Sequence, residues 1–253
     1  MTELTLKELL EAGVHFGHQT SRWNPKMKPF IFIERNGIYI LDLQKTLVCV
    51  KDACTAVERV IRSGRTVLFV GTKRQAKDVI AEEARRCGMY YVNERWFGGL
   101  LTNFQTIRRR ADYYEELVRM REEGKFAVFS KKEALGLEKR AQKLEKVLLG
   151  VVEMRELPGL VFVVDTKKEH LAVREANRLG IPVVGIVDTN SDPDPIDYPI
   201  PANDDAIRSI RLMSQRIADT VLESRQHIDK EREAAPRESP RNAGETARHA
   251  EAG

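Results

Sequence analysis

Apolar residues follow two different spacings along the chain, and each spacing indicates a different kind of structure. Short runs of branched apolar residues occupy 66–70, 89–92, 160–164 and 183–187, and segments with an apolar residue every three or four positions lie between several of them. Buried strands that alternate with helices are typical of a parallel sheet covered on both faces. The pattern therefore predicts an α/β fold built on a doubly wound parallel sheet.

Residues 103–157 interrupt this alternation with two longer helical segments joined by a short loop. Their apolar residues repeat at spacings of three and four, which is typical of a coiled-coil seam rather than of a helix that packs on a sheet. We therefore expect an inserted antiparallel coiled-coil arm, in which a helix of about 18 residues extends about 27 Å. The stripes are Phe104, Ile107, Ala111, Tyr114 and Val118 in the first segment, and Ala134, Leu137, Ala141, Leu144, Leu148 and Val151 in the second.

Turn and cap signals predict the elements that precede the apolar run 66–70. A capping box that begins at Thr5 predicts a short helix. Residues 14–29, rich in histidine, aromatic and basic residues, are expected to form a loop. The pair Asn36-Gly37 between two apolar runs predicts a β-hairpin, and Asp42 is expected to cap the long helix that follows it.

The C-terminal part contains one more loop and one more helix. A stretch dense in aspartate and proline, 188–203, is expected to be a loop, and a last helix should begin near Asp204. Residues 234–253 lack apolar periodicity, which predicts a disordered tail. We therefore expect a globular α/β domain formed by 1–102 and 158–230, with the coiled-coil insertion between them.

Composition narrows the class of protein. The chain has 253 residues, of which 42% are hydrophobic and 32% charged, and it contains no apolar run long enough to cross a membrane. The first residues lack the basic start and apolar core of a signal peptide. Three cysteines without a Cys-x-x-Cys pair fit a reducing cytosol. We expect a cytoplasmic protein without a membrane partner.

Charge is distributed unevenly along the chain. Residues 1–157 carry 29 basic and 21 acidic residues, whereas 158–253 carry 13 and 17. A basic half and an acidic half favour one face for nucleic acid and another for a different partner. The alternative is ordinary surface charge in contact with water.

Two basic segments are candidates for RNA contact. Cations on a projecting arm can reach phosphates well beyond the globular domain, although the alternative is a solvated coiled-coil face. The loop 14–29 combines cations with an aromatic ring, which suits backbone contact and base stacking, or else it folds over the sheet edge with its tryptophan buried. The candidates are Arg108, Arg109, Arg110, Lys131, Lys132, Lys139 and Arg140 in the arm, and Arg22, Trp23, Lys26 and Lys28 in the loop.

Aspartates follow two of the predicted strands. Asp165 and Asp188 each stand at the carboxyl end of a buried strand, where open α/β sheets bind ligands. One interpretation is a divalent ion held by Asp188 with Asp204 or Asp205 and aided by His18, since carboxylate oxygens suit such ions. The alternative is that Asp165 and Asp204 cap helices and that Asp-Pro pairs form turns.

Enzyme motifs give little support to catalysis. Gly71-Thr72-Lys73 stands between a strand and a helix, but the chain has neither a P-loop nor a Rossmann glycine motif. Segment 95–103, with its Gly-Gly pair, is best interpreted as a hinge packed by Trp96 and Phe97 at the base of the arm. The rival class is a metal-dependent phosphotransfer or small-molecule enzyme that uses Asp165 or Asp188.

Several ordered motifs resemble one family. The segments are Gly13-Val14-His15-Phe16-Gly17-His18-Gln19-Thr20, Trp23-Asn24-Pro25-Lys26-Met27, Phe69-Val70-Gly71-Thr72-Lys73-Arg74, Arg95-Trp96-Phe97-Gly98-Gly99 with Leu101-Thr102-Asn103, Lys131-Lys132-Glu133-Ala134-Leu135, Gly180-Ile181-Pro182, Ile186-Val187-Asp188-Thr189-Asn190-Ser191-Asp192-Pro193 and Asn203-Asp204-Asp205-Ala206-Ile207. Together they span about residues 5–222 and resemble the bacterial ribosomal protein S-two family of the small subunit.

The resemblance implies a fold and a function. It implies a flavodoxin-like domain with an inserted coiled coil, and a non-enzymatic protein with no required cofactor. It also implies that the chain binds small-subunit ribosomal RNA, lies beside neighbouring small-subunit proteins and helps to anchor the large ribosomal protein S-one.

Overall fold

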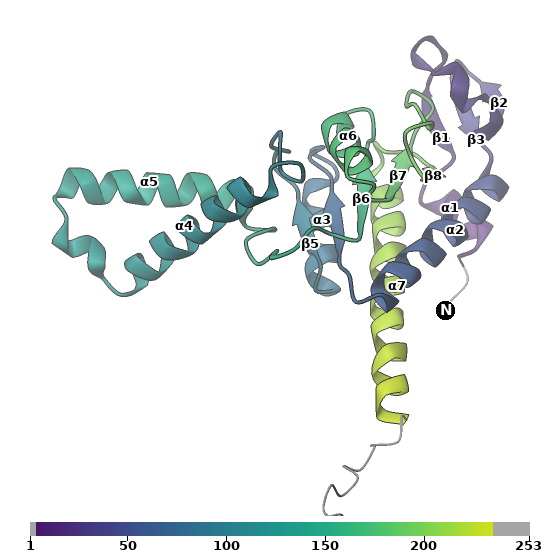
Figure 1. Cartoon of the computed structure of the whole chain (residues 1–253). Helices are drawn as coiled ribbons and strands as arrows, with labels where there is room; N and C mark the ends of the chain where they lie inside the picture. Colours follow the sequence, from purple (N-terminus) through teal and green to yellow (C-terminus); the bar gives the residue numbers. More distant parts are fainter. Residues whose placement is uncertain (1–3, 235–253) are drawn as a thin grey trace, which may run out of the picture.

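The computed structural model describes residues 4–234, and its centre is a five-stranded parallel sheet (Figure 1). Numbered along the chain within this sheet, the strands lie in the order 2-1-3-4-5, which is the flavodoxin-like order. The α/β prediction is confirmed, as are four of the five strands. Across the sheet the order is β5 (Tyr90–Val92), β4 (Val67–Val70), β6 (Leu160–Val164), β7 (Val183–Val187) and β8 (Tyr198–Pro201).

Helices cover both faces of this sheet. Phe69 and Phe162 point to one face, where their rings pack edge to face with centroids 5.4 Å apart. Leu68 and Val163 point to the opposite face, because successive side chains of a strand alternate. The first face packs against α2 (Leu43–Arg62), α3 (Lys77–Arg86) and α7 (Ile207–Ala234), and the second against α6 (His170–Arg178) and the base of α4 (Phe104–Glu122).

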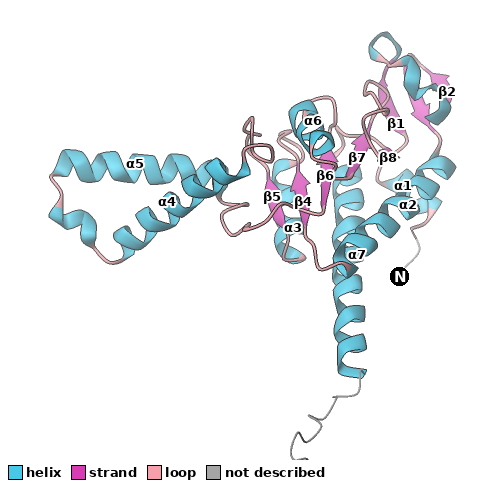
Figure 2. Cartoon of the chain, viewed as in Figure 1, coloured by secondary structure: helices cyan, strands magenta, loops and turns pink. Residues whose placement is uncertain are grey.

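A second, antiparallel sheet lies on the β8 side of the parallel sheet (Figure 2). Its three strands are in the order β1-β3-β2. The strands β2 (Ile31–Arg35) and β3 (Ile38–Leu41) form the predicted hairpin, and both turn residues adopt positive φ, as a type I′ turn requires. The expected loop 14–29 is wrong in part. It contains β1 (Phe16–Gln19), whose pairing with β3 is non-local and leaves no alternating apolar pattern in the sequence.

The remaining elements are three short helices in the N-terminal part and one proline-containing strand, β8. The capped helix is α1 (Leu6–Glu11), and two short 3-10 helices, η1 (Thr20–Arg22) and η2 (Pro25–Phe30), complete the segment that was expected to be a loop. The expected loop 188–203 is also wrong in part because it contains β8. Its prolines are tolerated because β8 is an edge strand.

The C-terminal helix and the tail complete the comparison with the sequence. The last predicted helix is α7, which starts three residues after Asp204 and runs to Ala234. The predicted tail, 234–253, begins at the last residue of this helix, and 235–253 lie outside the described residues. Among the described residues, no helix is long and apolar enough to cross a membrane.

A helical hairpin projects away from the parallel sheet (Figure 1). It consists of α4, the short 3-10 helix η3 (Lys125–Val128) and α5 (Lys131–Leu148). Ile107, Ala111 and Tyr114 of the predicted stripe are buried on α4, and Ala141 is buried on α5. Leu117 is buried as well, next to the predicted Val118, so the apolar face of α4 is wider than a strict seam.

Candidate functional site

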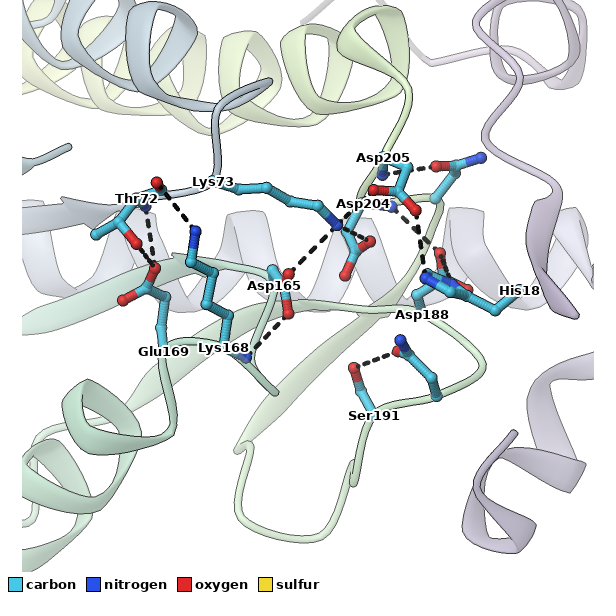
Figure 3. A network of polar contacts seen from close by, with 12 residues as sticks. His18, Thr72, Lys73, Asp165, Lys168, Glu169, Asp188, Ser191, Asp204 and Asp205 are labelled. Carbon is cyan, nitrogen blue, oxygen red and sulfur yellow. Dashed lines mark hydrogen bonds and ion pairs between the residues drawn. The ribbon is translucent and has the colours of Figure 1, made fainter. Parts of the chain in front are cut away.

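Charged side chains from five separate segments meet at the carboxyl end of the parallel sheet (Figure 3). The carboxyl ends of parallel strands share one edge, so the loops after β4, β6, β7 and β8 all contribute. The aspartate predicted to follow β6 adopts a left-handed conformation, φ 65°, which is uncommon for a residue other than glycine. The edge cluster, as we call this group, comprises His18, Lys73, Asp165, Asp188, Asp204 and Asp205.

Lys73 lies in the middle of the edge cluster. Its Nζ is 2.7 Å from an oxygen of Asp204, 2.7 Å from an oxygen of Asp205 and 3.3 Å from an oxygen of Asp165. Burial disfavours the ammonium form, but the hydrogen bonds to Asp204 and Asp205 outweigh it and raise the pKa of Lys73. The lysine is therefore a fixed cation that bonds to the residue after β6 and to the segment between β8 and α7.

His18 extends from β1 into the same cluster. Its Nδ1 is 3.0 Å from Oδ2 of Asp188, and its Nε2 is 3.2 Å from Oδ2 of Asp205. The hydrogen bond with Asp188 raises the pKa of His18, although burial opposes the charged form. The backbone N–H of His18 donates to Oγ1 of Thr189. The small sheet is thus attached to the loop after β7 through both the backbone and the side chain of one residue.

Asp204 is the most deeply buried carboxylate of the cluster. It is 0% exposed, and burial together with the charges of Asp188 and Asp165 raises its pKa to about 7. Its Oδ1 accepts a hydrogen bond from Lys73, but its Oδ2 is buried and has no hydrogen-bond partner among the described residues. An orphaned carboxylate oxygen in this environment is costly, since a buried charge normally pairs or coordinates a cation.

The alternative capping interpretation fails for both aspartates, because Asp165 stabilises a turn and α6 begins only after Glu169. Oδ1 of Asp165 accepts the backbone N–H of Lys168, as a turn residue does. Asp204 does not cap α7, because Asn203 accepts the backbone N–H groups of Asp205 and Ala206 instead. His18, Asp188 and Asp204 each offer one ligand atom, and these three atoms lie within 4.8 Å of one another. Asp205, the fourth predicted ligand, faces the other nitrogen of His18.

The segment Gly71-Thr72-Lys73 does not form an open phosphate cradle. The backbone N–H of Thr72 donates to Oε1 of Glu169 over 3.0 Å, and the Thr72 hydroxyl donates to the same oxygen. Lys168 directs its Nζ to the carbonyl of Thr72. The donors that a phosphate would need are therefore already occupied within the chain.

The N-terminal basic segment borders a cleft of about 770 Å³. Arg22 and Trp23 of this segment line the cleft, together with Lys167 and Arg174. The indole of Trp23 is half-buried and packs at 5.0 Å from the ring of Tyr39. The segment thus partly folds over the protein, in line with the alternative in which its tryptophan is buried. Trp23 nevertheless also lines the cleft.

The other two basic residues of this segment differ from each other. Lys26 is held by Asp192 at 2.8 Å and also by Asp194, so its charge is balanced inside the chain. Lys28 lies on the surface with an exposed side chain. Lys26 therefore connects the segment to the loop after β7, whereas the charge of Lys28 is exposed to solvent.

The three consecutive arginines of α4 have different environments. The side chain of Arg108 is only 14% exposed, and it donates to Asp112, Glu115 and the carbonyls of Val152 and Met154. Arg109 and Arg110 are exposed. Arg108 therefore ties the two ends of the hairpin together at its base. The other predicted arm residues, Lys131, Lys132, Lys139 and Arg140, are also exposed.

Sequence reasoning missed Glu175 of α6, which organises the hinge 95–103. Its carboxylate accepts the indole N–H of Trp96 over 3.0 Å, the hydroxyl of Thr102, and the backbone N–H groups of Gly99, Leu101 and Thr102. Burial works against the charged form, but these hydrogen bonds prevail and lower the pKa of Glu175. The sequence offered one signal for this role, because Glu175 is an acidic residue next to Ala172 and Ala176 on the apolar face of α6.

Fold and site together define a class of protein. A flavodoxin-like sheet uses its usual ligand edge for ion pairs within the chain, and a basic helical hairpin projects from it. This combination is typical of a protein that binds partners through its surface rather than one that converts a small molecule.

The family is established by comparison with known proteins. The model of the family "Ribosomal protein S2" matches residues 9–224. A relative from Geotalea uraniireducens (strain Rf4), "Small ribosomal subunit protein uS2", is 59% identical over 226 residues, which cover 89% of this chain and 88% of the relative. The chain belongs to the ribosomal protein S2 family. It is therefore a non-enzymatic ribosomal protein, and the rival enzyme that uses Asp165 or Asp188 is set aside.

Proposed function

We propose that this protein is a structural constituent of the small ribosomal subunit in the cytoplasm, where it binds small-subunit ribosomal RNA and supports translation. The observation that carries the proposal is the family match over residues 9–224. The family model includes both basic segments, and the relative named as a small ribosomal subunit protein matches 89% of the chain. Exposed cations on a projecting hairpin agree with this function, because phosphate contacts supply most of the affinity for RNA.

The first RNA-binding element in this proposal is the hairpin of α4 and α5. Residues 103–157 form an antiparallel coiled-coil arm, inserted into the α/β domain of 1–102 and 158–230. The buried faces of α4 and α5 support this interpretation, and their contacts are mostly made by small and apolar residues. The arm residues that contact phosphates are Arg109, Arg110, Lys131, Lys132, Lys139 and Arg140, whereas Arg108 holds the base of the arm.

The second RNA-binding element is the cleft beside the small sheet. Arg22 and Lys28 contact phosphates, and Trp23 stacks on a base at the mouth of the cleft. Lys26 keeps the segment in place through its ion pairs with Asp192 and Asp194. A cleft lined by an aromatic ring and several cations suits an unpaired nucleotide better than a duplex.

Protein partners complete the proposal. Outside the cleft, the acidic half of the chain, 158–253, is directed to protein rather than RNA, because its net negative charge is repelled by phosphate. The partners are ribosomal protein S-one, which this protein helps to anchor, and neighbouring small-subunit proteins. Asp194, in the loop after β7, is an exposed carboxylate at that end.

A matched pair of charge reversals tests the RNA proposal. Arg109→Glu with Arg110→Glu removes two exposed cations from the arm, and Lys51→Glu with Arg59→Glu makes the same change of charge on the exposed side of α2. Binding of each protein to small-subunit ribosomal RNA is measured over a series of salt concentrations. Each lost phosphate contact reduces the slope of log affinity against log salt by about 0.7 to 0.9.

We expect the arm variant to lose slope and at least about tenfold in affinity at low salt, and the α2 variant to change little. Equal losses in both variants would show that net charge, not the arm, controls binding. An unchanged slope in the arm variant would contradict the assignment of Arg109 and Arg110.

A further inference from the structure

The helical hairpin is joined to the rest of the molecule by two chain segments. The hinge 95–103 leads from β5 into α4, and a return segment, 149–159, leads from α5 back to β6 (Figure 1). None of the residues 118–140, which form the far part of the hairpin, is buried. The direction of the hairpin is therefore decided at its base, where the two segments meet the parallel sheet.

The return segment is fixed to the edge strand β5. The carbonyl oxygen of Gly150 accepts the backbone N–H of Tyr91 over 2.9 Å. A Cβ on Gly150 would lie 2.1 Å from the carbonyl oxygen of Tyr91, so this close approach requires glycine. Leu148 and Val151 are buried in the same apolar cluster as Leu101 of the hinge. Burial of apolar surface is non-directional, so this packing holds the base on the sheet but leaves its direction to the hinge.

The directional contacts of the hinge converge on one carboxylate, that of Glu175. Its Oε1 accepts the indole N–H of Trp96 over 3.0 Å and the backbone N–H of Gly99 over 2.7 Å. Its Oε2 accepts the backbone N–H groups of Leu101 and Thr102, over 3.0 and 3.1 Å, and also the Thr102 hydroxyl. Hydrogen bonds to a charged acceptor are directional and about twice as strong as neutral ones. Each oxygen thus holds a different half of the hinge.

The hinge passes this constraint directly to α4. The helix begins at Phe104, two residues after Thr102, and the side chain of its N-cap residue Asn103 makes no capping hydrogen bond. Glu175 itself belongs to α6, which packs on the parallel sheet through Ala172 and Ala176. The carboxylate therefore connects a helix of the globular domain to the start of the hairpin.

We propose that Glu175 is a positioning residue for RNA binding, because its carboxylate fixes the direction in which the hairpin leaves the sheet. This role rests on the proposed function, in which cations of the hairpin and of the cleft contact RNA. The 18 residues of α5 extend about 27 Å, so a swing of about 10° at the base moves the far end by about 5 Å. A fixed direction holds the two sets of cations at a set separation, and the second set then binds at a high effective concentration.

Loss of this carboxylate has a different signature from loss of a cation. A loosened hairpin keeps its phosphate contacts but must be ordered on binding, and this ordering lowers the affinity. The slope of log affinity against log salt reflects the number of phosphate contacts, so the slope stays unchanged. A lost cation lowers both the affinity and the slope. If Glu175 only stabilised the fold, its loss would change neither quantity in the folded chain.

The first measurement follows the direction of the hairpin in the absence of RNA. The full chain, with its three cysteines replaced by alanine, receives spin labels at Val128→Cys in η3 and at Leu179→Cys after α6, which are both exposed positions. Pulsed electron paramagnetic resonance gives the distribution of distances between the two labels. We expect one narrow distribution for the unaltered hinge and, for Glu175→Gln, a distribution wider by about 5 Å, as a swing of about 10° would produce.

The second measurement is the affinity for small-subunit ribosomal RNA over a series of salt concentrations, at a temperature where every variant is folded. Glu175→Gln should bind about tenfold more weakly with an unchanged slope. Glu231→Gln is the matched control, since it makes the same change of charge at an exposed position of α7, and it should bind like the unaltered chain. Arg109→Glu with Arg110→Glu should reduce the slope as well as the affinity.

Thr102→Val is a milder test of the same carboxylate and decides the matter if Glu175→Gln fails to fold. It removes only the hydroxyl that donates to Oε2 of Glu175 and preserves the size of the side chain. The distance distribution should widen, and the affinity should fall about two- to threefold without a change of slope.

Each contrary result has a distinct meaning. An unchanged distance distribution in Glu175→Gln would overturn the proposal, because packing alone would then set the direction. A slope that falls together with the affinity would show that the variant loses contacts rather than their alignment. Unchanged affinity in Glu175→Gln, with a loss in the arginine variant, would refute the positioning role and leave the RNA assignment in place. Unchanged affinity in both would overturn the RNA assignment and the binding role of Glu175 with it.

Discussion

The edge cluster and the helical hairpin contain the same kinds of charged residue in opposite environments. In the edge cluster, Lys73 lies among three carboxylates with a side chain only 16% exposed. In the hairpin, Lys131 and Lys132 are exposed at the start of α5. Removing a charge that the fold has surrounded with partners destabilises the chain itself, whereas an exposed charge remains available to a partner molecule.

Both environments occur within three consecutive arginines. Arg108 faces the chain and bonds to four groups of the hairpin base, while Arg109 and Arg110 point away from it. One turn of a helix is enough to separate the two functions, because neighbouring residues on a helix point about 100° apart. A basic run in a sequence is therefore a mixture of structural and binding residues.

The largest expected effect breaks the edge cluster. Lys73→Met removes the cation from three carboxylates, and leaving buried charges unpaired costs about 3–5 kcal/mol of the free energy of unfolding. Lys132→Met on the exposed hairpin should change this free energy by less than about 0.5 kcal/mol. Urea unfolding followed by circular dichroism measures both. Similar values for the two variants would remove the distinction drawn above.

The second effect concerns Glu175 and the hinge that connects the sheet to the hairpin. Glu175→Gln replaces one accepting oxygen by an amide that cannot accept a hydrogen bond. Two N–H groups of 95–103 lose their partner whichever oxygen is replaced, at a cost of about 2–3 kcal/mol near neutral pH. Chemical unfolding at pH 7 measures this cost, and a loss below about 0.5 kcal/mol would contradict the role of the carboxylate.

The same variant has a pH signature. The pKa of Glu175 is lowered in the folded protein from its ordinary value of 4.5, so its stabilisation is fully present above that value. It is lost as the pH falls through the lowered pKa of the folded state. The difference in unfolding free energy between the unaltered chain and Glu175→Gln should therefore shrink below pH 4.5. A difference that stays constant into acid would mean that shape, not charge, explains the cost.

The smallest effect compares neighbouring arginines. Arg108→Gln should lower the free energy of unfolding by about 1–2 kcal/mol, because it removes hydrogen bonds between a charged group and the hairpin base. Amide hydrogen exchange should increase locally near Val152 and Met154. Arg109→Gln, with an equal change in size and charge, should leave both unchanged. Faster exchange in both variants would indicate that helix charge alone controls the hairpin.

The sequence predicted most of the elements and few of the contacts. Apolar runs, the turn at Asn36-Gly37 and the cap at Asp42 are local signals, and the structure confirms the elements they predicted. The strands β1 and β8 were missed because neither has an apolar pattern of its own. Each forms only because a distant partner strand supplies its hydrogen bonds.

The candidate sites divide in the same way. Residue type indicated which side chains have useful chemistry, and strand ends indicated where Asp165 and Asp188 would lie. Contacts between distant or neighbouring segments of the folded chain decided the rest. They placed Arg108 inside the hairpin base, paired Lys26 with Asp192, and assigned Asn203 rather than Asp204 to the start of α7. Glu175 could be suspected only as an acidic residue on an apolar helix face.

By itself, the sequence determined the α/β class, the order of most elements, the uneven charge and the family to which the chain belongs. These properties depend on spacings within a few residues and on the identity of long ordered motifs. Only the tertiary structure decided which charges are paired. Lys73 and Asp204 are 131 positions apart, and His18 reaches Asp188 across a comparable distance along the chain. Such pairs depend on how the strands assemble, and no local spacing encodes that.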